Sequence, residues 1–241
     1  MAMTRRNVIG LSGAAVAALP FALHENLFAQ APAQGAAPEP WPDTLVERPL
    51  RAGFPAPLPL NADGSAPEHL ASEAGPISDP LMWRTPDRSA PPMEYDYQTL
   101  KVKIDTRGLG TMSGTLRFAD LDKLPHVSHT FLLQCGSANP RGIVTWTGVR
   151  FADFADTLGL VPGAHYCRVI GSDREYVDES MATLRHPQVM LAWMMNGAPI
   201  PAKHGAPLRL IVPFRYGKRS MKAITEIVFG TPSLPMPPLP V

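Results

Sequence analysis

Short apolar stretches at strand and helix spacing dominate the second half of the chain. Leu100–Ile104 alternates apolar and polar positions, as a half-buried strand does. Phe118–Leu124 and Phe151–Leu158 have helical spacing, ended by a proline and a glycine respectively. Further strands or apolar runs are expected at His129–Gln134, Ile143–Trp146, His165–Ile170, Val189–Met195, Leu208–Val212 and Met221–Phe229. Many short strands with a few short helices predict an α+β domain of mixed sheets, largely antiparallel or barrel-like.

Proline-rich segments flank this domain. The chain has 28 prolines, and residues 32–96 and 231–241 are dense in them. Proline lacks a backbone donor and disfavours both helix and central strand. A disordered linker is one interpretation of residues 32–96. We favour an N-terminal wrap over the domain surface, because Trp41, Phe54 and Trp83 need a place to pack, with residues 231–241 as a tail.

The first 31 residues have the pattern of an export signal. Arg5 and Arg6 precede a moderately apolar run that extends to about Leu23, and small residues follow around Ala29–Ala33. Paired arginines indicate the twin-arginine route, with a general secretory signal or a membrane anchor as alternatives. We therefore expect a periplasmic protein. Because that route carries folded proteins, a cofactor inserted before export is also expected.

Composition narrows the class of protein. The net charge is +1, which gives no reason to expect a nucleic-acid partner, and 45% of the residues are hydrophobic. Only two cysteines are present, so a disulfide-dense scaffold and a tetracysteine metal site are excluded. The chain lacks a Cys-x-x-Cys-His motif for covalent haem. A single domain with a real core is expected.

Cys135 is the first candidate for chemistry. It ends a predicted strand and opens a loop of small residues, Gly136–Gly142, where a bulky ligand can approach the backbone. Thiolate is a soft ligand suited to redox metals. A disulfide between Cys135 and Cys167 is an alternative in an exported protein, as is an inert buried thiol.

A second constellation runs from His204 to Lys222. Cations cluster at both ends of the buried strand Leu208–Val212, with glycines nearby. Arginine forks, lysine and backbone donors can together clamp a phosphate. The alternative is a solvated basic loop.

Three stretches together resemble the sulfite oxidase family of molybdenum enzymes, in particular its compact exported members. Leu132–Phe151 resembles the family's cysteine loop and W-x-G-V segment. Leu191–Pro201 is similar to its L-A-x-x-M-N-G-x-x-L-P, and His204–Lys222 to its H-G-x-P-x-R-x-x-V-P and following basic loop. The resemblance covers residues 97–230 and implies a catalytic domain with the sulfite-oxidase-type molybdopterin-binding fold, wrapped around one molybdenum–molybdopterin cofactor.

The resemblance also assigns roles by position. Cys135 becomes the protein ligand to molybdenum. Arg84 stands where the family often has F-x-R-N-H, although Thr85 and Pro86 replace the Asn-His pair. Arg84, Arg141, Arg215 and Arg219 are implied as residues that attract an anionic substrate. The implied cofactor-binding residues are Arg84, Asp173, His204, Arg209, Ser220, Met221 and Lys222.

The implied activity is oxygen-atom transfer on a small sulfur oxyanion such as sulfite. Electrons would pass to an external partner, either a c-type cytochrome or a membrane quinol-linked subunit. A first alternative is methionine-sulfoxide reduction, because Phe214–Gly217 resembles that branch of the family. A neutral substrate would need fewer arginines around it. A second alternative is a non-enzymatic exported binding module in which Cys135 is oxidised to Cys167.

Overall fold

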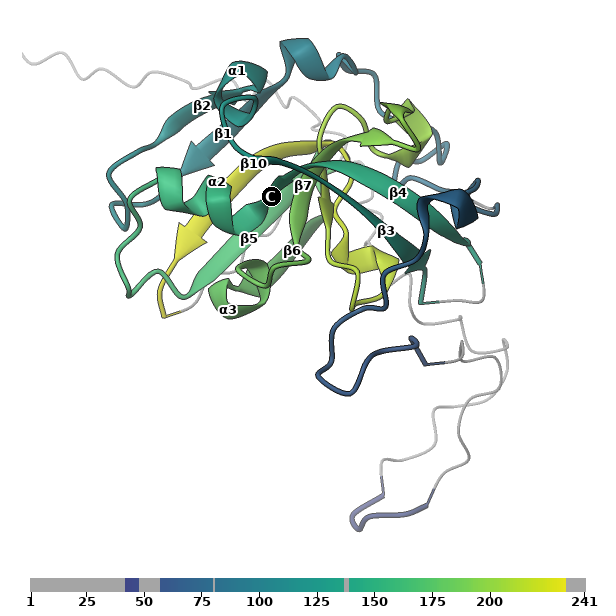
Figure 1. Cartoon of the computed structure of the whole chain (residues 1–241). Helices are drawn as coiled ribbons and strands as arrows, with labels where there is room; N and C mark the ends of the chain where they lie inside the picture. The colour runs from purple at the N-terminus through teal and green to yellow at the C-terminus, as the bar shows by residue number, and fades with distance from the viewer. Residues whose placement is uncertain (1–41, 48–56, 80, 137–138, 233–241) are drawn as a thin grey trace, which may run out of the picture. The chain divides into compact units, whose positions relative to one another are not determined.

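The computed structural model describes residues 42–47, 57–79, 81–136 and 139–232 (Figure 1). The chain divides into two compact units, Met1–Pro49 and Leu50–Val241. The described part of the first unit, residues 42–47, contains neither helix nor strand. The predicted export signal and most of the predicted tail lie outside the described residues. The following description concerns the second unit.

The first sheet has five strands in the order β2-β1-β10-β5-β6 (Figure 1). β1 and β10 pair in parallel, and the other neighbours are antiparallel. The strands are β1 (Lys101–Asp105), β2 (Gly114–Arg117), β5 (Tyr166–Gly171), β6 (Tyr176–Ser180) and β10 (Ile224–Gly230).

The second sheet is antiparallel in every described pair. Its order is β3-β4-β7-β8, and β9 also pairs with β7. The strands are β3 (His126–Gln134), β4 (Arg141–Arg150), β7 (Met190–Met195), β8 (Ala198–Pro199) and β9 (Arg209–Ile211). The predicted α+β class with mixed sheets is confirmed. The barrel-like arrangement is not confirmed. The described strands form two open sheets, and each strand pairs only with strands of its own sheet.

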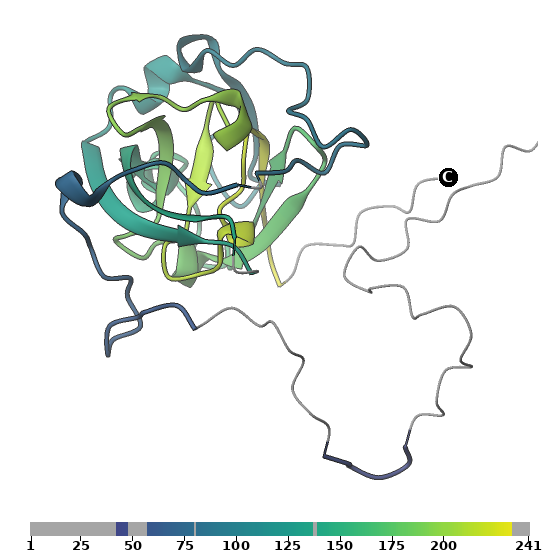
Figure 2. The same cartoon turned by 90° about the vertical axis from the view of Figure 1, so that its right-hand side faces the viewer.

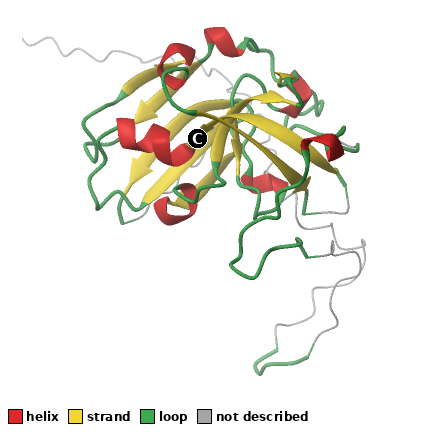
Figure 3. Ribbon diagram, viewed as in Figure 1, coloured by secondary structure: helices red, strands yellow, loops and turns green. Residues whose placement is uncertain are grey.

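The helices are short and lie at the ends and outside of the strands (Figures 2 and 3). They are α1 (Phe118–Leu121), α2 (Phe151–Thr157) and α3 (Met181–Leu184), with 3-10 turns at Ala71–Glu73, Tyr97–Thr99, Ala202–His204 and Gly217–Arg219. Within the described residues, no helix has the length and apolar character needed to cross a membrane.

The main core lies between the two sheets and includes side chains from both, such as Val102, Leu191 and Phe229. Gly148 shows how closely the second sheet is packed. A β-carbon at Gly148 would lie 1.9 Å from the Leu191 carbonyl oxygen, and the β4–β7 register shifts at this residue. The glycine of the W-x-G-V segment is therefore required by this strand pairing.

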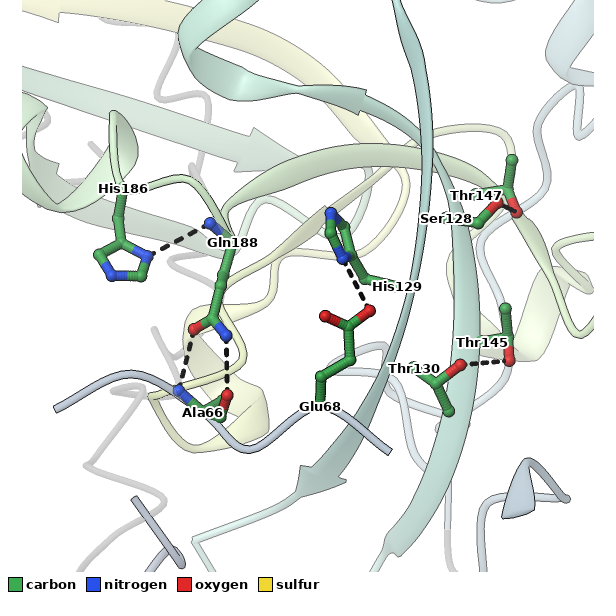
Figure 4. A network of polar contacts seen from close by, with 9 residues as sticks. All are labelled: Ala66, Glu68, Ser128, His129, Thr130, Thr145, Thr147, His186 and Gln188. Atoms are coloured by element: carbon green, nitrogen blue, oxygen red, sulfur yellow. Dashed lines mark hydrogen bonds and ion pairs between the residues drawn. The ribbon is translucent and has the colours of Figure 1, made fainter. Parts of the chain in front are cut away.

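Parts of the proline-rich segment within the second unit pack against the domain. Ala66 donates its backbone N–H to Gln188 Oε1 and accepts from Gln188 Nε2, at 2.9 and 2.7 Å (Figure 4). Glu68 Oε1 lies 2.9 Å from His129 Nδ1 on β3 (Figure 4). Trp83 is 3% exposed. Trp41 and Phe54 lie outside the described residues, so the full extent of the wrap stays a prediction.

Candidate cofactor and active site

Cys135 lies directly after β3, in the hairpin that leads into β4. Its backbone N–H donates to the Pro140 carbonyl at 2.9 Å, and the preceding Gln134 is paired with Arg141. The thiol is therefore placed by the strand pair and remains half-buried rather than covered. Cys167 is fully buried on β5, and burial raises its thiol pKa well above the ordinary value. The two cysteines are not disulfide-bonded, and Cys167 is a core thiol.

Arg209 is a buried cation on β9, 4% exposed. Its Nη1 donates to the His204 carbonyl at 2.6 Å, and its guanidinium lies 5.1 Å from the centre of the Trp146 ring. Its Nε has no partner, and no ion pair joins Arg209 to a carboxylate among the described residues. Burial lowers the pKa of Arg209 to about 10. A buried charge without an opposite charge is costly, so this site is built for an anion that comes from outside the chain.

Lys222 is the second cation of the site. Burial lowers its pKa to about 8, helped by Arg209, while Asp173 and Cys135 oppose the shift. The lysine is therefore within electrostatic reach of all three. Gly205 lets its backbone come close: its φ is +105°, and a β-carbon there would lie 2.7 Å from the Lys222 β-carbon. Only glycine suits both constraints.

His204 completes this cluster. It is 5% exposed, and its Nδ1 has no partner. Burial lowers its pKa to about 4, with further lowering by Arg209, Lys203 and Lys222. The imidazole is therefore neutral near pH 7, with one nitrogen left for a ligand.

This shift makes the cofactor-free protein sensitive to acid. The unfolded chain binds the His204 proton near pH 6.5 and the folded chain only near 4, so stability falls as the pH drops through this window. We expect cofactor-free protein to lose about 2 kcal/mol of unfolding free energy from this group between pH 7 and 5. Urea titrations at both pH values measure it. In a His204→Gln variant, the drop in unfolding free energy between pH 7 and 5 should be smaller by about this amount. A drop equal to that of the parent would contradict the assignment.

Asp173 and Arg84 meet at the turn after β5. The Arg84 backbone N–H donates to Asp173 Oδ2 at 3.4 Å, and its guanidinium pairs with Glu175 at 3.2 Å. Gly171 allows the contact with the basic loop, since a β-carbon there would lie 2.8 Å from the Lys222 carbonyl oxygen. The structure thus brings Arg84, Asp173 and Lys222 together from three distant parts of the sequence.

Ser220 and Met221 hold this loop through internal contacts. Ser220 is 2% exposed, and its hydroxyl accepts from the Val212 backbone N–H at 3.0 Å. Met221 packs in the main core, and its carbonyl accepts from the Leu210 N–H. Both residues therefore position Lys222, and direct binding of the cofactor by them stays a prediction.

The arginines expected to attract an anion differ in their surroundings. Arg219 Nε pairs with Glu179 at 2.6 Å, its Nη2 donates to the Asp178 carbonyl, and Glu179 is 7% exposed. Arg84 is paired with Glu175 as described. Arg141, at the start of β4, is exposed and has no ion pair among the described residues. Arg215 is exposed, and its guanidinium lies 5.8 Å from the centre of the Phe214 ring. Two of the four predicted arginines are thus already paired with carboxylates.

The arrangement fits a molybdopterin. Buried polar atoms of His204 and Arg209 have no partner among the described residues, nor has Ser172 Oγ next to Asp173, and the cations of the cluster are the buried Arg209 and the half-buried Lys222. A phosphate and a pterin ring would provide acceptors and donors for them. The described residues contain no cluster of three or more His, Cys, Asp or Glu that could hold a metal by itself. A metal held by one thiolate and by the cofactor's own sulfurs suits such a donor set.

The sequence missed two side chains at this site. Trp83 lies with its ring centre 4.0 Å from Lys222 Nζ, and Ser172 Oγ is one of the orphaned atoms. Their position in the sequence could have revealed them, because Trp83 directly precedes Arg84 and Ser172 directly precedes Asp173, and both of these neighbours were predicted site residues.

Comparison with known proteins defines the class. The sequence model of the family described as "Oxidoreductase molybdopterin binding domain" matches residues 89–234. With the fold and site above, this defines a molybdopterin-binding oxidoreductase with molybdenum as its metal. The chain belongs to this family, within its sulfite-oxidase-type branch.

Individual relatives match parts of the chain. The chain is 42% identical over 83 residues to a protein-methionine-sulfoxide reductase catalytic subunit of Xanthomonas campestris, covering 34% of the chain and 24% of the relative. It is 28% identical over 204 residues to the sulfite oxidase of Arabidopsis thaliana, covering 70% of the chain and 51% of the relative. The chain thus spans between a quarter and half of these relatives.

A solved structure shows the same fold. The sulfane dehydrogenase SoxCD from Paracoccus pantotrophus superposes with a TM-score of 0.56 at 18% identity, covering 90% of this chain and 60% of that chain.

Proposed function

We propose that this protein reduces a neutral sulfur oxide, such as the sulfoxide of methionine, to the sulfide. The balanced reaction takes one oxygen from the substrate with two electrons and two protons, and releases water. The observation that supports this choice is the pairing of Arg84 with Glu175 and of Arg219 with Glu179. Carboxylates cancel these charges, and an anion such as sulfite would find fewer attracting groups than the sequence alone predicts.

The chain's own residues hold and orient the cofactor. Arg209 and Lys222 would bind its phosphate, with His204 and Asp173 as hydrogen-bond partners of the rest. Cys135 would supply the protein sulfur to molybdenum. When bound, the cofactor supplies the two-electron chemistry and the acceptor of the oxygen atom. The protein sets its orientation, its electrostatic surroundings and access from the Cys135 side.

Electron supply and location belong to the same proposal. We infer an external redox partner, either a c-type cytochrome or a membrane quinol-linked subunit, because the chain has no haem-attachment motif. The twin-arginine pattern at Arg5 and Arg6 supports periplasmic export.

Sulfite oxidation is the second candidate, supported by the likeness to the Arabidopsis sulfite oxidase. Both reactions should be assayed on the same cofactor-loaded protein: methionine sulfoxide with a reduced dye, and sulfite with an oxidised dye. We expect turnover of the sulfoxide, with kcat/KM for sulfite at least about 100-fold lower. The reverse ratio would overturn the proposal.

The Arg141→Gln variant sharpens the comparison. Arg141 is exposed at the start of β4 and pairs with Gln134, the residue before Cys135. Like Arg215, it is a predicted arginine without an ion pair among the described residues. A neutral substrate should keep its KM within about 3-fold. For an anionic substrate, KM should rise about 10-fold or more, because one charge-assisted hydrogen bond disappears. A selective rise in KM for the sulfoxide would contradict the neutral-substrate assignment.

A further inference from the structure

Trp83 is a buried side chain with an unused donor. It is 3% exposed, yet its indole Nε1–H has no hydrogen-bond partner among the described residues. An unsatisfied buried donor is unfavourable, and the indole N–H of a buried tryptophan usually finds an acceptor. A group not yet bound is the simplest source of that acceptor.

The surroundings of Trp83 indicate which group this is. The Lys222 ammonium lies 4.0 Å from the centre of the indole ring and donates to the Met82 carbonyl at 2.9 Å. Asp173 accepts from the N–H of Arg84, the next residue. Trp83 thus contacts Lys222 and directly precedes Arg84, so it lies beside residues that would hold the cofactor.

The segment that carries Trp83 is locally fixed. The backbone N–H of Trp83 donates to the Arg88 carbonyl at 3.3 Å, and the backbone N–H of Arg88 donates to the Thr85 carbonyl at 2.9 Å. These two bonds close a tight turn. The ion pair between Arg84 and Glu175 fastens the same turn to the region after β5. The indole is therefore held beside Lys222 before any ligand arrives.

We propose that Trp83 is a cofactor-binding residue, whose indole N–H donates to an acceptor atom of the molybdopterin held by Lys222 and Arg209. The turn formed by residues 82–88 then acts as a strap that retains the cofactor. The cofactor offers phosphate oxygens and pterin nitrogen and oxygen atoms as acceptors. This inference concerns cofactor retention and is independent of which sulfur compound is the substrate.

The test compares Trp83→Phe with the parent. Phenylalanine keeps an aromatic ring against Lys222 and removes only the N–H. We expect molybdenum and pterin to leave the purified protein about 10-fold faster at a fixed temperature, as the loss of one hydrogen bond to a charged acceptor predicts. The cofactor-free variant should melt within about 2 °C of the cofactor-free parent, because removing an unpaired donor costs the fold little.

Trp193→Phe is the matched control. Trp193 is also 3% exposed, but it packs in the main core against Phe118 and His126. This variant should release cofactor at the parent's rate. Equal release from Trp83→Phe and the parent would overturn the proposal. So would a fall in the melting temperature of cofactor-free Trp83→Phe that accounts for the faster release, since that outcome shows a structural role only.

A second measurement needs no variant of altered stability. In ¹⁵N-tryptophan spectra of the parent, the Trp83 indole N–H should shift and exchange more slowly with solvent when the oxidised cofactor is bound. An indole signal that is the same with and without cofactor would overturn the proposal. Failure of sulfoxide turnover would leave both of these readouts untouched, so the two proposals fail separately.

Discussion

Replacing Arg209 by methionine should remove the cofactor from the protein while leaving the cofactor-free fold as stable as before, or more stable. Arg209 is 4% exposed, and burial lowers its pKa to about 10. Its interactions are with the His204 carbonyl and the Trp146 ring, neither of which cancels its charge. Replacing a buried charge by an apolar side chain of similar length therefore removes an unfavourable term from the cofactor-free protein.

The cofactor-loaded protein should respond in the opposite direction. Removing one partner of a buried ion pair costs about 3–5 kcal/mol, which corresponds to a loss of cofactor affinity of more than about 100-fold. Molybdenum and pterin content after gel filtration measures the loss, and melting of cofactor-free protein measures the fold. Full cofactor content in the variant would show that Arg209 does not face the cofactor.

Arg168→Met provides the contrast. Arg168 is also buried, at 8% exposed, but it is paired with Asp178 at 2.7 Å and lies over the Tyr176 ring. Its loss should lower stability by about 1 kcal/mol, because Asp178 remains partly solvated, and should leave cofactor content unchanged. The two arginine variants should therefore show opposite patterns of stability and cofactor content.

Replacing Cys135 by alanine should abolish activity with little effect on folding. The thiol would be the protein ligand to molybdenum, and loss of a ligand should lower turnover by more than the 10- to 100-fold typical of residues that merely support ligands. Cys135 is half-buried in a hairpin whose anchor is the backbone bond to Pro140, which alanine retains. The cofactor should remain bound through Arg209 and Lys222, so molybdopterin content separates the ligand role from a folding defect.

Cys167→Ala is the control for Cys135. Cys167 is fully buried on β5, away from solvent, with a raised pKa. Its replacement should lower the unfolding free energy by about 1 kcal/mol through lost packing and leave turnover intact. Turnover by Cys135→Ala close to that of the parent would contradict the metal-ligand assignment.

The sequence predicted secondary structure correctly where a segment had one clear periodicity or stop signal. The alternation at Leu100–Ile104 became β1, the helical spacing at Phe151–Leu158 became α2, and the glycine expected to end α2 has a φ of +57°. β6 was missed. It carries two adjacent acidic residues, the exposed Asp178 and the buried Glu179, which have low strand propensity, and their pairing with Arg168 and Arg219 stabilises the strand instead.

The site likewise contains residues that the local sequence identifies and contacts that it does not. Cys135 and the run His204–Lys222 could be identified from the chain because their chemistry and spacing lie within short segments. That Arg219 is neutralised by Glu179, or that Trp83 lies against Lys222, depends on contacts between residues 40 and 139 positions apart. Such contacts are set by strand pairing and by how the proline-rich segment packs, and no local pattern encodes them. The sequence by itself determined the class of chemistry. Only the tertiary structure decided which charges remain available to a substrate, because charge cancellation depends on distance in space.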